Sequence, residues 1–253
     1  MATEPALGKG VVILGATSAI ARAAAIELGL RGYDLILASR DIEENQVLAL
    51  DVEVRTGAKV AAFPFEAEDT SSHAAFFAQC RDHFGEGLAG VVLCFGYLDD
   101  QKTAQQDFDL ARRTIDVNYT GAVSILELFA GHFEERRKGF ICAVSSVAGD
   151  RGRQSNYLYG SAKAGLTAYL QGLRNRLFKS GVAVTTVKPG FVDTKMTFGK
   201  PNLMLVAPAE KAGKDIVIAA LKGKDVVYTP WFWRYIMLII QHVPETVFKR
   251  LKL

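Results

Sequence analysis

The sequence is short of the features that mark several common classes of protein. It has three cysteines, Cys80, Cys94 and Cys142, with no C-x-x-C pair, which argues against a disulfide framework and predicts no metal site. A net charge of +3 is too weak to indicate a nucleic-acid partner. No run reaches the roughly 18 to 20 apolar residues of a transmembrane helix, and residues 1–10 show no signal peptide. We therefore expect a protein of the reducing cytoplasm.

What the sequence does contain is a regular alternation of short apolar runs and helical patterns. Its 253 residues, 49% of them hydrophobic, suit one sizeable domain. The runs lack polar alternation, as parallel strands covered on both faces do. They predict an α/β fold with a Rossmann-type, doubly wound, seven-stranded parallel sheet. The predicted strands are 11–14, 34–38, 59–65, 90–94, 139–145, 182–188 and 225–228, and the predicted helices are 20–31, 41–56, 70–84, 104–133, 157–179 and 208–222.

The first predicted strand ends in a tight turn that opens a helix. Such a turn presents free N–H groups and a partial positive charge, which suit the pyrophosphate of a dinucleotide. The usual pattern has three glycines, whereas here Gly15 is followed by Ala19 and Ala21 at the other two places. An ordinary turn whose Ser or Thr caps the helix is the alternative. The residues expected to contact a dinucleotide here are Gly15, Thr17, Ser18 and Ile20.

The end of the second predicted strand carries Ser39, Arg40 and Asp41. In dinucleotide-binding folds an acidic residue at this place binds the ribose 2′-hydroxyl, while an arginine favours a 2′-phosphate. Ser39 and Arg40 therefore favour NADP(H), and Asp41 keeps NAD(H) as the alternative. Arg40 as a solvated loop residue is the competing interpretation.

A serine, a tyrosine and a lysine form the pattern with the clearest chemistry. Tyr159 and Lys163 share a face of a predicted helix, and Ser146 lies thirteen residues before Tyr159, after a predicted strand. A lysine ammonium lowers the pKa of a neighbouring tyrosine, which can then exchange a proton with an oxygen whose carbon exchanges a hydride. Tyr157 lacks a lysine four residues on, and Ser145 lacks the spacing of Ser146.

Over nearly its whole length the chain resembles the short-chain dehydrogenases/reductases. Residues 117–121 resemble the family's helix segment with its fourth catalytic residue, and residues 188–196 resemble its Pro-Gly motif after the sixth strand. The resemblance implies that Tyr159 is the general acid in reduction and that Lys163 lowers its pKa and binds the nicotinamide ribose. It further implies that Ser146 orients the carbonyl and that Asn118 holds a water in a proton relay; a bridge between strands is the alternative role of Asn118.

The resemblance also implies cofactor contacts along the chain. Glu66 and Ala67 fall where the family contacts adenine, and Val192 and Thr194 where it contacts the nicotinamide carboxamide. The family's Asn-Asn-Ala-Gly after the fourth strand is reduced to Gly96. The expected cofactor-binding residues are Gly15, Thr17, Ser18, Ile20, Ser39, Arg40, Glu66, Ala67, Gly96, Tyr159, Lys163, Pro189, Gly190, Val192 and Thr194.

Beyond a main domain of residues 1–230, residues 231–253 form an apolar and basic extension. Two tryptophans and a tyrosine accompany an aliphatic run, and four basic residues stand against one acidic residue. This composition is typical of a segment lying on an anionic membrane, here at the inner face. A subunit interface and a lid over an apolar substrate pocket are the alternatives. The family resemblance implies a homodimer or homotetramer.

The extension, residues 145–153 and the Thr17–Ser18 turn resemble the decaprenylphosphoryl-2-keto-ribose reductases. That resemblance implies a keto-sugar on a polyprenyl phosphate, whereas Arg40 departs from a branch expected to prefer NADH. We therefore expect an NAD(P)H-dependent reductase that converts the ketone of a small-molecule or lipid-linked substrate into a secondary alcohol. A soluble 3-ketoacyl, alcohol or steroid dehydrogenase and a non-catalytic NADP-binding scaffold or sensor are the alternatives.

Overall fold

The computed structural model describes residues 8–197 and 205–251 of the chain. Its strands form one seven-stranded parallel sheet in the order β3-β2-β1-β4-β5-β6-β7. The strands are β1 (Gly10–Leu14), β2 (Asp34–Ser39), β3 (Val60–Pro64), β4 (Leu88–Leu93), β5 (Phe140–Val144), β6 (Ala183–Pro189) and β7 (Val226–Thr229). The larger helices are α1 (Ala19–Leu30), α2 (Ile42–Thr56), α3 (His73–Phe84), α5 (Phe108–Ile115), α6 (Gly121–Arg136), α7 (Tyr157–Leu177), α8 (Ala209–Leu221) and α9 (Trp233–His242). The prediction of a single-domain, doubly wound sheet is confirmed.

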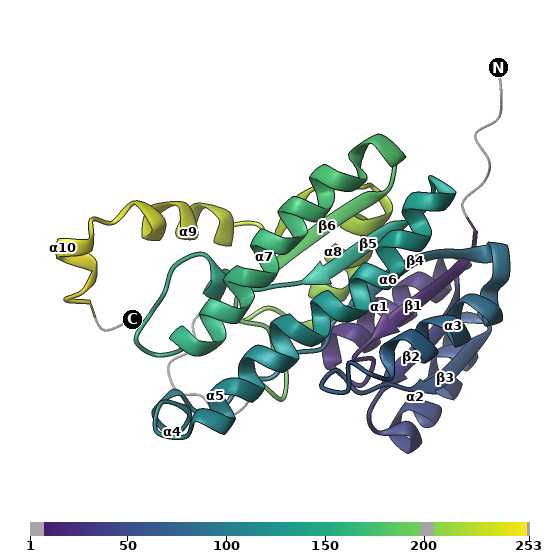
Figure 1. Cartoon of the computed structure of the whole chain (residues 1–253), viewed down its shortest axis with the longest axis horizontal. Coiled ribbons are helices and arrows are strands. Elements are labelled where there is room, and N and C mark those ends of the chain that lie inside the picture. Colours follow the sequence, from purple (N-terminus) through teal and green to yellow (C-terminus); the bar gives the residue numbers. More distant parts are fainter. Residues whose placement is uncertain (1–7, 198–204, 252–253) are drawn as a thin grey trace.

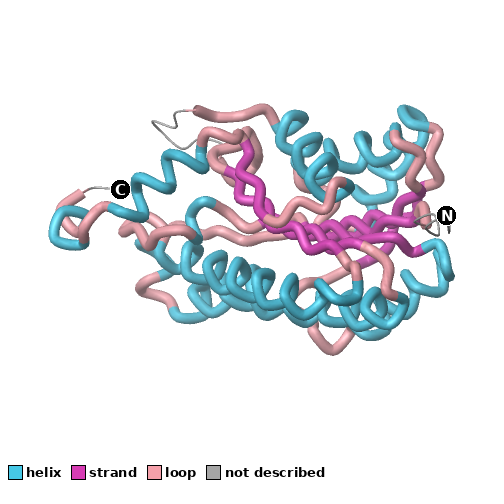
Figure 2. The backbone as a smooth tube through the Cα atoms, turned by 90° about the horizontal axis from the view of Figure 1, so that it is seen from above, coloured by secondary structure: helices cyan, strands magenta, loops and turns pink. Residues whose placement is uncertain are grey.

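The sheet is covered by helices on both faces, as Figures 1 and 2 show. Alternate residues of β1 enter different cores: Val12 and Leu14 pack with α3, α6 and α7, while Val11 and Ile13 pack with α1, α2 and α8. Side chains of a strand point to opposite faces in turn. Both faces are therefore apolar, which explains the continuous hydrophobic runs in the sequence.

Helices α1 and α8 lie unusually close together. A Cβ on Gly213 of α8 would lie 2.5 Å from the Cβ of Ala23 and 2.7 Å from the backbone nitrogen of Ala24. Small residues on both helices therefore let the backbones approach. This contact fixes the start of α1 beside the start of α8.

The single helix predicted over residues 104–133 is wrong in detail. The short helix α4 (Gln101–Ala104) stops, and the Asp107 carboxylate then accepts a hydrogen bond from the Asp109 nitrogen at 3.0 Å, which caps the new helix α5. Between α5 and α6 the chain adopts one π-helical turn, η2 (Asp116–Thr120). Asx capping and the π turn change the backbone locally and leave the apolar periodicity intact, so the pattern alone does not reveal them.

The C-terminal extension forms α9 and a short helix α10 (Glu245–Phe248) beyond β7. Figure 1 shows these helices, in yellow, projecting from one end of the body. Within the described residues, no helix combines the length and apolar character needed to cross a membrane. The last two residues, including Lys252, lie outside the described part of the chain.

Candidate active site

Ser146, Tyr159 and Lys163 meet at the carboxyl end of β5. Ser146 follows this strand and caps the short helix η3 (Val147–Gly149), because its Oγ accepts from the Ala148 nitrogen at 3.0 Å. The Ser146 hydroxyl also lies near the Tyr159 hydroxyl and acts to lower the pKa of the tyrosine. Tyr159 and Lys163 are only 9% and 2% exposed, respectively. The fold therefore holds the three groups together in a site shielded from water.

The ammonium of Lys163 is fixed by the strand that precedes Ser146. Its Nζ donates to the carbonyl oxygen of Val144 at 3.1 Å, and its backbone carbonyl accepts from Ser145 Oγ at 2.9 Å. Ser145 is thus a structural neighbour of Lys163. Because an ammonium has three donors, this arrangement leaves Nζ with capacity to hold the hydroxyls of a ribose. Burial lowers the pKa of Lys163 to about 8.

The electrostatics of Tyr159 differ from the sequence-based expectation. Burial raises the pKa of Tyr159 to about 12, and the hydrogen bond to Ser146 opposes that rise. Lys163 Nζ lies 5.7 Å from the centroid of the tyrosine ring and bonds the Val144 carbonyl. Desolvation of the phenolate therefore dominates. Lys163 is not among the groups that shift the pKa of Tyr159 here, and its lowering of that pKa stays a prediction.

Asn118 lies in the π turn η2 and bridges two segments. Its Nδ2 donates to the Tyr97 and Thr114 carbonyl oxygens at 2.6 and 2.8 Å, and its Oδ1 accepts from the Tyr97 nitrogen at 3.2 Å. The asparagine thereby fixes the loop after β4, where a Cβ on Gly96 would lie 3.0 Å from Asn118 Oδ1 and 3.4 Å from Lys163 Nζ. Gly96 permits this close approach, and the role of Asn118 in a proton relay stays a prediction.

The first turn keeps the glycine that its backbone needs. Gly15 has a φ of +79°, and a Cβ there would lie 2.6 Å from the backbone nitrogen of Phe95. Ser18 caps α1, since its Oγ accepts from the Ala21 nitrogen at 3.2 Å. The capping role weighed as the ordinary alternative is therefore present. The N-terminus of this twelve-residue helix lies next to Thr17 in the chain. A helix N-terminus is a favourable place for an anion.

The three polar residues at the end of β2, Ser39, Arg40 and Asp41, have different contacts. Ser39 Oγ donates to the Asp41 carbonyl oxygen at 3.0 Å, and the Asp41 carboxylate caps α2 by accepting from the Glu44 nitrogen at 2.9 Å. Arg40 stays exposed and lies 3.9 Å from the Glu66 carboxylate. Arg40 and Glu66 line a common hollow with Pro64, Phe65, Ser72, Ala75, Phe76 and Gln79.

This hollow suits an adenosine carrying a 2′-phosphate better than one with a free 2′-hydroxyl. Asp41 is committed to the α2 cap, whereas the guanidinium of Arg40 is exposed. Ala67 lies outside the hollow, buried where its carbonyl oxygen would be 2.1 Å from a Cβ on Gly121. The structure therefore brings Arg40 and Glu66 together in one hollow and gives Ala67 a packing role beside α6.

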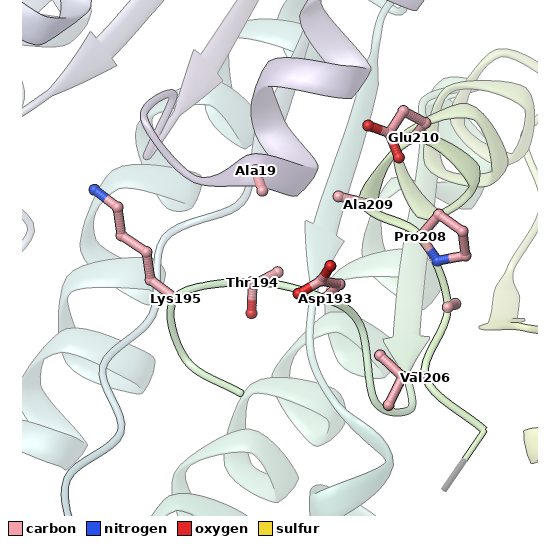
Figure 3. Close-up of a pocket in the computed structure, with 9 residues that line it drawn as sticks. Ala19, Asp193, Thr194, Lys195, Val206, Pro208, Ala209 and Glu210 are labelled. Carbon is pink, nitrogen blue, oxygen red and sulfur yellow. The ribbon is translucent and has the colours of Figure 1, made fainter. Parts of the chain in front are cut away.

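A second hollow lies between the N-terminus of α1 and the chain that follows β6 (Figure 3). Thr194 lines it, and its nitrogen donates to Thr197 Oγ1 at 3.1 Å. Val192 is buried against α8 together with Ile20, so these side chains serve packing. The lining residues are Ala19, Asp193, Thr194, Lys195, Val206, Ala207, Pro208, Ala209 and Glu210.

Pro189 and Gly190, which precede Thr194 in the chain, are in contact with residues after β7. The Gly190 nitrogen donates to the Thr229 carbonyl oxygen at 3.0 Å. A Cβ on Gly190 would lie 1.9 Å from Nε1 of Trp233 in α9. Pro189 ends β6. Pro189 and Gly190 therefore position the loop at its junction with the C-terminal extension.

The fold and the spacing of these groups agree with the comparisons with known proteins. Residues 9–202 match the family model described as short chain dehydrogenase. An uncharacterized oxidoreductase of Mycobacterium tuberculosis is 32% identical over 241 residues, which are 95% of this chain and 96% of the relative. An uncharacterized oxidoreductase of Streptomyces coelicolor is 34% identical over 245 residues, 96% of each chain.

The chain belongs to the short-chain dehydrogenase family.

Solved structures show the same fold at lower identity. A short-chain dehydrogenase of Sphingobium yanoikuyae in complex with NADPH superposes with a TM-score of 0.81 at 22% identity, over 93% of this chain and 96% of that one. An actinorhodin polyketide ketoreductase with NADPH superposes with a TM-score of 0.79 at 18% identity, over 89% and 97% of the two chains. This short-chain dehydrogenase is therefore an oxidoreductase with the complete fold of its family.

Sequence reasoning missed the groups that anchor the loop between Ser146 and Tyr159. The Asp150 carboxylate forms a buried ion pair with Lys188 and accepts from the Tyr228 hydroxyl at 2.8 Å. Arg151 binds the C-terminal extension. The charges at 150, 151 and 188 are visible in the sequence, but their pairing joins segments far apart in the chain, so no local spacing signals it.

Proposed function

We propose that this short-chain dehydrogenase reduces a ketone to a secondary alcohol with NADPH, on a lipid-linked or otherwise apolar substrate. The observation that carries the proposal is the placement of Tyr159, buried beside Ser146 and Lys163 at the carboxyl end of β5. With a pKa raised to about 12 by burial, the hydroxyl keeps its proton at neutral pH. A protonated tyrosine beside a carbonyl oxygen is a proton donor, which is the role that reduction needs.

The chain's own residues divide the work of the reaction. Ser146 and Tyr159 hydrogen-bond the carbonyl oxygen and orient its carbon. When bound, the reduced nicotinamide supplies the hydride. Negative charge that develops on the oxygen is then quenched by the Tyr159 proton, and the Lys163 ammonium stabilises the phenolate that is left. Asn118 keeps the loop after β4 in place and, in this proposal, holds the water that returns a proton.

Several groups favour NADPH over NADH. Arg40 is exposed at the end of β2, and the carboxylate of Asp41, which would favour NADH, is committed to capping α2. The Sphingobium dehydrogenase and the actinorhodin ketoreductase, which share this fold, were solved with NADPH. The Arg40 guanidinium is exposed and only loosely paired with Glu66, so it can bind a 2′-phosphate.

The lipid-linked substrate is supported by the outward face of α9. Trp231, Tyr235, Leu238 and Ile239 are between 52% and 69% exposed. Arg234, Lys249 and Arg250 are exposed on the same extension, whose acidic Glu245 is paired with Arg151. An apolar face edged with unopposed cations is complementary to an anionic lipid surface. We place the extension on such a surface, beside a site that reduces a polyprenyl-phosphate-linked keto-sugar.

Vesicle binding tests this placement. Co-sedimentation of the full chain with phosphatidylglycerol vesicles should exceed that with phosphatidylcholine vesicles and fall in Ile239→Asp. Val54→Asp, at an 87% exposed valine of α2, is the matched control and should bind as the wild type does. Equal, weak sedimentation with both lipids would remove the membrane assignment. Loss of a dimer in Ile239→Asp, with no vesicle binding, would assign the face to a second copy of the chain.

Cofactor binding tests the reductase itself. In fluorescence titrations the wild type should bind NADPH more tightly than NADH, and Arg40→Ala should lose most of that preference. Arg55→Ala, at an exposed ion pair of α2, should leave it unchanged. A preference for NADH would indicate that Arg40 is a solvated surface residue without a role in cofactor binding. It would also favour the resemblance to the keto-ribose reductases. Failure to bind either nucleotide would favour a scaffold without turnover.

A further inference from the structure

The loop between Ser146 and Tyr159 contains two arginines, of which Arg151 has hydrogen-bond partners for its guanidinium and Arg153, among the described residues, does not. Arg151 has partners on the C-terminal extension: it donates to the Gln241 carbonyl oxygen at 3.0 Å, to the Val243 carbonyl oxygen at 3.3 Å and to Glu245 at 2.6 Å. Its guanidinium also lies 4.2 Å from the centroid of the Phe248 ring. The guanidinium of Arg151 therefore binds α9 and α10 to the loop.

The guanidinium of Arg153 has no such partners among the described residues. Arg153 is partly buried, its Nε is shielded from water, and among the described residues no acceptor or carboxylate forms a hydrogen bond or ion pair with its guanidinium. Burial lowers the pKa of Arg153, and Asp150 opposes that shift electrostatically. Both oxygens of Asp150 are already engaged, by Lys188 and by the Tyr228 hydroxyl. The guanidinium of Arg153 is therefore left without a hydrogen-bonded or ion-paired partner among the described residues.

Other buried polar atoms without partners in the described chain lie at the start of α7, which follows Arg153 in the sequence. Asn156, whose nitrogen donates to the Arg153 carbonyl oxygen at 3.1 Å, has a buried Oδ1 without a partner in the described chain. Gln101 is 8% exposed, and its Oε1 accepts from the Leu158 nitrogen at 3.1 Å in the first turn of α7. The Nε2 of Gln101 also has no partner among the described residues. These groups surround the N-terminus of a 21-residue helix, three residues before Tyr159.

An unpaired guanidinium and unpaired amides in a partly buried place are unfavourable for stability alone. Native proteins keep such groups where a ligand completes them. Guanidinium groups bind phosphate oxygens through two parallel hydrogen bonds, and a helix N-terminus adds a favourable partial charge. The guanidinium of Arg153, the Nε2 donor of Gln101 and the helix N-terminus all favour an oxyanion, and none of them is used by the carbonyl chemistry of Ser146 and Tyr159.

We infer that Arg153, with the N-terminus of α7 and Gln101, forms a subsite for a phosphate group on the ketone substrate. The inference rests on the proposed reductase function, because it gives the substrate's anionic part a place beside the carbonyl site. Arg153 selects an anionic substrate, while the serine, tyrosine and lysine carry out the reduction. It does not depend on the identity of the remainder of the substrate.

Calorimetric titration with butyl phosphate, in the presence of NADPH to fill the nucleotide's own phosphate positions, tests the subsite directly. The wild type should bind butyl phosphate and not butan-1-ol, its neutral counterpart. Arg153→Met, which keeps the aliphatic stem, should weaken binding by about ten- to a hundred-fold, and Arg153→Lys should retain part of it. Arg55→Ala is the control and should bind as the wild type does. Equal binding by wild type and Arg153→Met, or no binding by the wild type, would overturn the inference.

A kinetic comparison separates this inference from the reductase assignment. Ribulose 5-phosphate and ribulose differ by the phosphate group, and Arg153→Met should raise KM for the phosphorylated ketone alone. If neither ketone is reduced, the butyl phosphate titration still tests the phosphate subsite independently of the reductase function. Arg153→Met should also unfold at the same urea concentration as the wild type or a higher one, because no native partner of the guanidinium is lost. A marked loss of stability would indicate a structural role instead.

Discussion

In the body of the molecule the central strands are buried from end to end, whereas the α9–α10 extension buries only Trp233, Met237 and Phe248 among its described residues. The body encloses Tyr159 and Lys163 and changes their pKa values by desolvation. The extension is held by the Trp233 cluster, by Arg151 and by two further side-chain hydrogen bonds, from Gln154 to the Leu251 carbonyl oxygen and from Gln241 to the Asp150 carbonyl oxygen. Burial thus fixes Tyr159 and Lys163, while the extension is attached through far fewer buried side chains.

The largest expected effect lies in the body, at the proton donor. Tyr159→Phe removes the hydroxyl and leaves the ring in its buried place, so reduction should fall by about a hundred- to ten-thousand-fold. NADPH affinity should change little, because Lys163 is the residue that we expect to hold the ribose. Steady-state reduction kinetics and a fluorescence titration check the two halves of this prediction. Full activity in the variant would remove Tyr159 from the mechanism.

The next effect concerns the turn before α1. Gly15→Ala places a Cβ 2.6 Å from the Phe95 nitrogen at a φ of +79°, so we expect the free energy of unfolding to fall by about 2 to 5 kcal/mol. Gly32→Ala is the matched control, because Gly32 has a φ of +81° with open space around it. Its loss should be smaller, about 1 kcal/mol. Urea unfolding of both variants measures the difference, and equal losses would show that the contact with Phe95 does not matter.

A pH dependence of stability should distinguish the body from its surface. The pKa of Lys163 falls from 10.5 to about 8 on folding, so below pH 8 the folded state carries the penalty of a buried charge. Between about pH 8 and 10.5 the folded chain sheds this proton while the unfolded chain keeps it. The wild type should therefore gain stability with rising pH relative to Lys163→Met, on the order of 2 kcal/mol.

Urea unfolding at pH 7.5 and pH 10 measures this gain. Lys224→Met, at an exposed lysine after α8, is the control, and the difference between it and the wild type should stay constant over the same interval. A constant difference for Lys163→Met as well would mean that the ammonium is not desolvated.

The smallest effect should lie in the extension. Arg151→Ala removes the contacts to Gln241, Val243 and Glu245, and since Glu245 is exposed we expect a local loss of about 1 kcal/mol. Hydrogen exchange of α9 and α10 should accelerate, while the urea midpoint of the body stays the same. Protection that is unchanged in α9 would show that the Trp233 cluster and the Gln154 and Gln241 hydrogen bonds hold the extension without Arg151.

Much of this architecture could be predicted from local patterns. Seven unbroken apolar runs predicted the parallel sheet, because strands covered on both faces leave no polar alternation. The spacing of Ser146, Tyr159 and Lys163 predicted that they meet, since a strand end and one helix face fix their directions. The break at Asp107 escaped prediction because a single side-chain cap outweighs helical periodicity there.

The sequence by itself determined the family, the sheet and the identity of the groups around the carbonyl site, because these depend on periodicity and on spacing within single elements. The tertiary structure alone decided the pKa of Tyr159, which follows from burial instead of from the neighbouring lysine. It also decided that Arg151 has partners and Arg153 has none within the described chain. Burial and charge pairing are set by segments distant in the chain, so no local pattern of residues carries them.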